Sequence, residues 1–227
     1  MSDADSIAID GPAASGKTTV GRLVARRLNY LYLDTGAMYR ALTALADETQ
    51  THLDNQTALV HLLEAHPMRV ELDAHAAGGY RIFTGGREVT PNQLIAGHVT
   101  AGVSTVAAHP QVRAQMVRAQ RAIAARGPVV MAGRDIGTVV LPNARVKIFL
   151  TASLEERVAR RRAELEESVV RIDAARLRQE IQERDRLDES RSTAPLRQAA
   201  GAKIIDSTGM TADEVAAAIV ACVPSVS

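Results

Sequence analysis

The sequence predicts an α/β fold with a doubly wound, five-stranded parallel sheet. Five short apolar runs, rich in leucine or β-branched residues, are separated mostly by segments with helical periodicity. Buried parallel strands have this pattern. The predicted strands are residues 6–9, 30–33, 129–131, 146–150 and 203–205. In such a sheet, ligands bind at the carboxyl ends of the strands.

The first strand leads into a segment with the pattern of a phosphate-binding loop (P-loop). Gly11 and Gly16 enclose four residues and precede Lys17 and Thr18, and an amphipathic run extends from there to Leu28. Glycines let successive amides face one anion, and the following helix adds unpaired N-terminal amides. We expect Lys17 to reach the β and γ phosphates and Thr18 to offer its hydroxyl to Mg²⁺. Only three of the 27 basic residues are lysines, so a lysine here favours phosphate binding over a merely structural turn.

Two segments interrupt the alternation of strands and helices, and we expect both to form lobes. Residues 68–89 alternate in polarity around Gly85 and Gly86, which predicts a small antiparallel sheet with a two-residue turn. Residues 157–191 nearly balance arginines with acidic residues, which favours an ion-paired helical hairpin over a nucleic-acid patch. We therefore expect one domain, with a core of residues 1–35, 106–152 and 192–227, a first lobe at 36–105 and a second lobe at 153–191.

The starts of three helices are marked by their first residues. The run of residues 110–125 opens with Pro110, which suits the first helical turn because proline lacks an N–H group. Ser153 and Thr211 are each followed three residues later by glutamate, and both precede apolar-periodic runs. This spacing is the capping-box pattern.

Composition narrows the classes of function. A net charge of +1 gives no polyanion-binding signature, so nucleic acid is not an expected partner. One cysteine, Cys222, excludes an internal disulfide framework and suits a reducing compartment. There is no signal-peptide layout, and no run approaches the ~20 apolar residues that span a bilayer. We expect a soluble, cytoplasmic monomer without a membrane partner.

Arginines in loops after the parallel strands indicate chemistry on phosphate. Arg40 follows the second strand and Arg134 follows the third, so both lie at the edge where the P-loop opens. Several arginines around one cleft suit a phosphate acceptor beside a triphosphate donor, and an ionised phosphate acceptor needs no general base. Arg113, in the first turn of the helix at Pro110, is open to a site role or a surface role by position alone. The same holds for Arg184 and Arg191, which we place on one face of a late helix.

Three other classes of P-loop protein fit the sequence less well than a kinase with a phosphate acceptor. A switch GTPase needs an Asn-Lys-x-Asp segment, which is absent, and the Asp-x-x-Gly match at residues 206–209 follows the last strand. A kinase for a small hydroxylated metabolite would share the fold and the donor site, but the many arginines disfavour it. A regulatory or scaffold protein that binds ATP without turnover is disfavoured by Lys17, Thr18 and the acceptor arginines.

Together these segments resemble the bacterial cytidylate kinases, a family of P-loop nucleoside monophosphate kinases. The resemblance covers residues 6–222 and includes IDGPAASGKTT, YLDTGAMYRALT, GRDIGTVV and ERDRLDESR, of which the last two are the most specific. It implies Mg²⁺-dependent transfer of the ATP γ-phosphoryl group to CMP or dCMP, giving ADP and CDP or dCDP. The hairpin at residues 68–89 would belong to the monophosphate-binding lobe, and residues 153–191 would include a lid that excludes water.

The resemblance also assigns residues to the two nucleotides. The ATP-binding residues would be Gly11, Pro12, Ala13, Ala14, Ser15, Gly16, Lys17, Thr18, Thr19 and Arg161. The CMP-binding residues would be Thr35, Tyr39, Arg40, Ser104, Arg113, Arg134, Asp135, Arg184, Asp188 and Arg191. Of all these, the catalytic residues would be Lys17, Arg134, Arg184 and Arg191.

Within the CMP set, the resemblance implies distinct contacts. Ser104, Arg113 and Asp135 would read cytosine, because a carboxylate that accepts from its amine, beside a donating arginine, excludes uracil. Arg40, Arg134 and Arg191 would hold the acceptor phosphate. Arg184 and Asp188 would contact the sugar.

The resemblance also bears on the metal and on the lid. Ala132 stands where the family often has an acidic residue, so Mg²⁺ would rely on Thr18 and the phosphates, with Asp10 as a further candidate. The cluster that resembles the mobile lid is Arg157, Arg160, Arg161 and Arg162.

Overall fold

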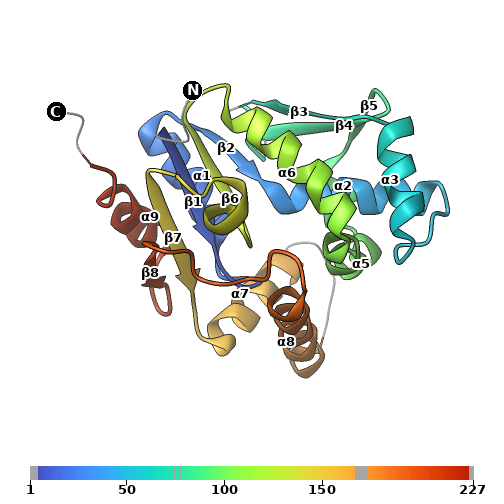
Figure 1. The fold of residues 1–227 in the computed structure, drawn as a ribbon. Coiled ribbons are helices and arrows are strands. Elements are labelled where there is room, and N and C mark those ends of the chain that lie inside the picture. The colour runs from blue at the N-terminus through green and yellow to red at the C-terminus, as the bar shows by residue number, and fades with distance from the viewer. Residues whose placement is uncertain (1–4, 74, 77, 167–172, 225–227) are drawn as a thin grey trace.

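A computed structural model describes residues 5–73, 75–76, 78–166 and 173–224 of the chain. Its centre is a five-stranded parallel sheet with the strand order β2-β6-β1-β7-β8 (Figure 1). The strands are β1 (Ser6–Asp10), β2 (Leu31–Asp34), β6 (Val129–Gly133), β7 (Val146–Thr151) and β8 (Lys203–Asp206). The predicted fold class is confirmed, and each predicted strand is present with its bounds shifted by two residues at most.

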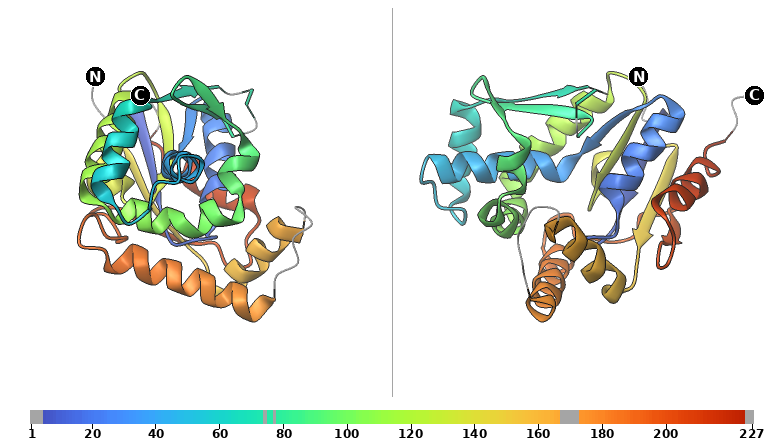
Figure 2. Two further views of the ribbon diagram at one scale, coloured as in Figure 1. Left: turned by 90° about the vertical axis from the view of Figure 1, so that its right-hand side faces the viewer. Right: turned by 180° about the vertical axis from the view of Figure 1, so that it is seen from behind.

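Helices cover both faces of this sheet (Figures 1 and 2). Ile7 and Ile9 of β1 pack in one cluster with α1 (Lys17–Leu28) and α9 (Ala212–Val220). Ala8, between them, joins the opposite cluster with α2 (Thr35–Glu48) and α6 (Pro110–Ala124). Successive strand residues face opposite sides, so an unbroken apolar strand is buried on both faces.

The first lobe contains the small antiparallel sheet that residues 68–89 predict. Its strands are β3 (Met68–Leu72), β4 (Tyr80–Thr84) and β5 (Arg87–Val89), in that order. Gly85 and Gly86 join the last two strands with φ angles of 54° and 81°, a backbone that strongly favours glycine. Besides α2, this part of the chain contains the helices α3 (Gln56–Ala65), α4 (Pro91–Ile95) and α5 (Gly97–Ala108). Val70 and Ile82 bury one face of the sheet in the core that α2 shares.

The second lobe is a pair of packed helices, α7 (Leu154–Glu166) and α8 (Ala174–Ser190), which lie below the sheet in Figure 1. The capping box at Thr211 is complete. At Ser153 only half of the expected box is present, because Ser153 accepts from the Glu156 amide while the Glu156 carboxylate accepts from Arg160.

The prediction that Arg184 and Arg191 share one helical face is wrong. Helix α8 ends at Ser190, and Arg191 is its C-cap residue in an extended conformation. Arg191 therefore reaches the site from the segment after the helix. No helix in the described part of the chain combines the length and apolarity needed to cross a bilayer.

Candidate active site

The P-loop connects β1 to α1 and encloses Lys17. A Cβ atom on Gly11 would lie 2.0 Å from the carbonyl oxygen of Leu150, so only glycine fits there. Gly16 has a φ of 87° and caps α1 without a side-chain hydrogen bond, which leaves the first amides of the helix to a ligand. The Lys17 ammonium is buried, and it donates to the Pro12 carbonyl at 2.5 Å and to the Ser15 hydroxyl at 3.1 Å.

Two cations near the loop are held in an unfavourable environment. Burial and then the neighbouring Arg134 lower the pKa of Lys17 well below its ordinary value. The same two causes, in the same order, lower the pKa of Arg184 to about 10. A cation that is penalised by burial and by like charges is stabilised when an anion arrives. Both residues are therefore suited to a phosphate group.

A cluster of buried charges lies at the carboxyl end of β6. Arg113 of α6 forms an ion pair with Asp135 and donates to the Ala107 carbonyl at 3.0 Å. Arg134 Nε donates to Asp188 of α8 at 2.7 Å. Arg191 lies 3.9 Å from Asp135 and 3.8 Å from Asp188. The structure thus brings together residues from α6, α8 and the loop after β6.

The loop that bears Arg134 and Asp135 is held by Asp10, at the end of β1. The two carboxylate oxygens of Asp10 accept from the amides of Ile136 and Gly137 at 2.8 and 2.7 Å. Ile136 opens a π-helical turn, η2 (Ile136–Val140). Burial raises the pKa of Asp10 to about 6, against the effect of these two hydrogen bonds. Asp10 therefore positions this loop, and its contribution to the metal site stays a prediction.

The loop after β2 contributes a second paired arginine. Asp34 caps α2 by accepting from the Gly36 amide at 2.9 Å, and its other oxygen accepts from Arg40 at 2.8 Å. Burial alone would raise the pKa of Asp34, but Arg40 beside it holds that pKa below its ordinary value. The Thr35 hydroxyl donates to the Ala132 carbonyl at 3.0 Å, which joins this loop to β6.

Several buried donors around the cluster have no hydrogen-bond partner in the described part of the chain. They are Tyr39 Oη, Arg40 Nε, Arg113 Nε, Arg184 Nε and Arg191 Nη2. Buried polar groups are normally satisfied, and a lost partner costs about 1–3 kcal/mol. Guanidinium groups with free donors in a region of excess positive charge fit an anionic ligand.

The remaining expected site residues lie on the surrounding helices. Ser104 is half-buried on α5, and Thr18 and Thr19 are exposed in the first turn of α1. Arg161 pairs with Glu164 on α7 at 2.9 Å, and no hydrogen bond between Arg161 and the P-loop is seen among the described residues.

Two lid arginines of the sequence analysis instead contact the P-loop directly. Arg157 donates to the Ala13 carbonyl at 3.1 Å, and Arg160 approaches the Ser15 carbonyl at 3.4 Å. Arg160 also donates to the Ser207 hydroxyl at 2.9 Å. Sequence reasoning missed this role, although residues three apart share one face of a helix. It also missed Asp185, which accepts from the Ala13 amide at 2.9 Å.

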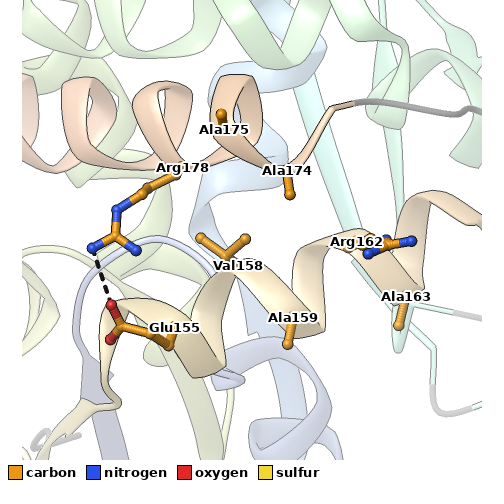
Figure 3. Close-up of a pocket in the computed structure, with 8 residues that line it drawn as sticks. All are labelled: Glu155, Val158, Ala159, Arg162, Ala163, Ala174, Ala175 and Arg178. Atoms are coloured by element: carbon orange, nitrogen blue, oxygen red, sulfur yellow. Dashed lines mark ion pairs between the residues drawn. The ribbon is translucent and has the colours of Figure 1, made fainter.

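A separate hollow lies between α7 and α8 (Figure 3). An ion pair of 3.0 Å between Arg178 and Glu155 crosses one end of it. The residues that line the hollow are Glu155, Val158, Ala159, Arg162, Ala163, Ala174, Ala175 and Arg178. None of them belongs to the P-loop or the charge cluster, so this hollow is not the candidate nucleotide site.

The donor set suits a metal that is held mainly by its substrate. Among the described residues there is no group of three His, Cys, Asp or Glu side chains that could hold a metal ion. Thr18 is exposed beside the P-loop. Mg²⁺ keeps several waters and binds nucleotides through their phosphates with few protein ligands, so these residues fit it.

Comparisons with known proteins agree with this geometry. The model of the cytidylate kinase family matches residues 7–225. A cytidylate kinase of Geobacillus sp. is 51% identical over 209 residues, covering 92% of this chain and 92% of that protein. One of Enterococcus faecalis is 50% identical over 214 residues, covering 94% and 93%. A solved structure of an uncharacterized protein from Eubacterium ventriosum shares the fold alone, with a TM-score of 0.52, 12% identity and coverage of 96% and 97%. The chain belongs to the cytidylate kinase family.

Proposed function

We propose that this chain transfers the γ-phosphoryl group of ATP to CMP or dCMP, giving ADP and CDP or dCDP. The observation that carries the proposal is the cluster of arginines near the P-loop lysine, several with buried donors that have no partner among the described residues. Family membership and the names of its relatives supply the substrate class.

The donor site would form where Lys17 and the first amides of α1 meet. On ATP binding, the Lys17 ammonium would exchange its bonds to Pro12 and Ser15 for phosphate oxygens. Mg²⁺, held by Thr18, the phosphates and water, would neutralise charge on the transferring group. Arg161 on α7 would approach ATP as the second lobe closes.

The acceptor site would form around the charge cluster. Arg40, Arg134 and Arg191 would hold the CMP phosphate, whose ionised oxygen is the nucleophile. No residue has to remove a proton, so catalysis consists of charge neutralisation and alignment of the two phosphates. Arg134 and Asp188 both act on the pKa of Arg184, which supports a role for Arg184 between the acceptor phosphate and the sugar.

Base selection would rest on the ion pair of Arg113 with Asp135. Asp135 would accept from the cytosine amine, and Arg113 would donate to N3 and O2. Uracil places a carbonyl oxygen where cytosine has the amine, so Asp135 would repel it. Ser104 of α5 and Tyr39 of α2 would complete this wall of the proposed site.

The test is steady-state phosphoryl transfer from Mg·ATP to CMP, dCMP, UMP, AMP, GMP, dTMP and shikimate, followed by ADP release. We expect strong selectivity for CMP and dCMP. The Lys17→Ala variant is the control for contaminating kinases and should show almost no turnover. Turnover of shikimate alone, or of no acceptor, would contradict the proposal and favour the metabolite-kinase or regulatory readings.

A further inference from the structure

A side chain of the second lobe forms a hydrogen bond with the backbone of the P-loop. One carboxylate oxygen of Asp185, on α8, accepts from the Ala13 amide at 2.9 Å. Its other oxygen accepts from Arg157 of α7 at 2.5 Å. Both side chains are largely buried, with the two residues 9% exposed each. The loop that is expected to hold the ATP phosphates is therefore bonded to both helices of the second lobe.

Arg157 also forms a hydrogen bond with Ala13. Its Nη1 donates to the Ala13 carbonyl at 3.1 Å, and its Nε donates to the Ala152 carbonyl at 3.3 Å. Both backbone polar groups of Ala13 are thus satisfied by one ion pair. Ala152 follows β7, so the pair joins the P-loop, the sheet edge, α7 and α8 at one point.

The helix that supplies Asp185 also supplies the acceptor cluster. Asp188 lies one turn further along α8, roughly 4.5 Å along the helix axis. It accepts from Arg134 at 2.7 Å. A short path therefore runs from Ala13 through Asp185, one rigid helical turn and Asp188 to Arg134. This path connects the donor loop to the acceptor arginines without crossing a flexible segment.

We infer that Asp185 and Arg157 are positioning residues that set the distance between the two phosphate sites. The inference rests on the proposed function, because it assigns the P-loop to ATP and the arginine cluster to CMP. In-line transfer depends steeply on alignment, and a displacement of about 1 Å can cost on the order of 10²-fold in rate. Because desolvation offsets much of the attraction in a buried ion pair, we assign this pair a geometric role rather than a stabilising one.

The test replaces Asp185 with asparagine, which keeps the shape and an acceptor for Ala13 but turns an amide N–H₂ toward Arg157. We expect kcat to fall about 10–100-fold, whereas the Kd of ATP alone and of CMP alone should each change less than about threefold. A bisubstrate probe, adenosine and cytidine joined by five phosphates, spans both sites. Its affinity should fall by much more than that of either nucleotide.

The matched control is Glu183→Gln on the same helix. Glu183 is exposed and pairs only with Arg186 among the described residues, so kcat and probe affinity should stay at the wild-type values. Thermal unfolding verifies that each variant is folded. If Asp185→Asn does not fold, Arg157→Lys takes its place, because lysine keeps the charge but cannot bond Asp185, Ala13 and Ala152 together.

The outcomes separate the inference from the proposed function. An unchanged kcat, or equal losses in the affinities for ATP, CMP and the probe, would overturn the positioning role even if wild type phosphorylates CMP. If wild type prefers another acceptor, the proposed function fails, and the ratio of variant to wild type with that acceptor still decides the inference. A selective loss of kcat and of probe affinity supports it.

Discussion

At the scale of single residues, the proposed role of Asp135 separates base recognition from phosphate chemistry. Its buried carboxylate pairs with Arg113. We expect Asp135→Ala to lower the ratio of kcat/KM for CMP to that for UMP by roughly 10–100-fold, since one base contact discriminates by about 1–3 kcal/mol. Steady-state kinetics with both monophosphates measures this ratio. An unchanged ratio would show that another group reads the base.

Asp10 predicts a pH dependence of stability. Its pKa is raised from an ordinary value of 3.8 to about 6, mainly by burial. Between these two values the folded state binds a proton that the unfolded state does not, so this carboxyl adds stability as the pH falls through 6. From pH 7 to pH 5 the gain in the free energy of unfolding should be roughly 1 kcal/mol.

The variant Asp10→Asn isolates that gain, because asparagine does not titrate. Urea unfolding of wild type and variant at pH 7, 6 and 5 measures the difference between them. The difference should move in favour of wild type as the pH is lowered. A constant difference, or one that moves the other way, would contradict the raised pKa.

The sequence predicts which residues lie at the candidate site, but not which partners they contact. Gly11, Lys17 and Arg134 follow from motif spacing and strand position alone. The pairing of Asp185 with Ala13 joins residues 172 positions apart, and no local pattern encodes it. A run of arginines does not reveal which of them turns inward, so the sequence alone assigns Arg157 to the mobile lid.

At the scale of elements, the contact of β7 with the P-loop predicts the effect of Gly11→Ala. The new Cβ atom would lie 2.0 Å from a backbone oxygen of Leu150, which cannot move without shifting β7. We expect a loss of about 3 kcal/mol in the free energy of unfolding, with ATP affinity lost as well. The control is Gly97→Ala, since nothing lies within 4 Å of an added Cβ there. Equal unfolding midpoints for the two variants would contradict the close contact.

The complete capping box at α9 predicts a smaller effect. The Thr211 hydroxyl accepts from the Glu214 amide, and the Glu214 carboxylate accepts from the Thr211 amide at 2.8 Å. Thr211→Ala should cost about 1 kcal/mol of unfolding free energy. Thr105→Ala, at an exposed position within α5, serves as the control and should cost less. Chemical denaturation measures both costs, and equal costs for the two variants would contradict the expectation.

The strands and the hairpin could be predicted because their signals are local. Apolar runs of strand length and a Gly-Gly turn depend only on neighbours in the chain. The end of α8 could not be predicted, because arginine is compatible with a helix. In the structure Arg191 is extended, and its guanidinium donates to the Ala194 carbonyl at 2.6 Å. The half-formed box at Ser153 also depends on a competitor, Arg160, for the glutamate.

At the scale of the whole molecule, the surface predicts a monomer. The exposed large hydrophobic residues of the described chain are Ile95, Leu187 and Ile204, at 58%, 39% and 55% exposure. They lie on three different elements, α4, α8 and β8, whereas stable interfaces bury on the order of 800 Å² per partner. Sedimentation equilibrium should give a mass of 24.3 kDa. A mass of twice that value at micromolar concentration would contradict the prediction.

The strand order of the central sheet has a consequence for synthesis on the ribosome. Strand β1 sits in the middle, where Ser6 pairs with Val129 and Ile7 pairs with Val146. At roughly 5–20 residues per second, the nascent chain carries an unpaired β1, with its apolar run of Ile7, Ala8 and Ile9, for roughly 7–30 s before both neighbours emerge. The segment that becomes the most enclosed strand is therefore exposed longest to aggregation and to chaperones. Slower translation before residue 146 would lengthen that interval without changing the finished protein.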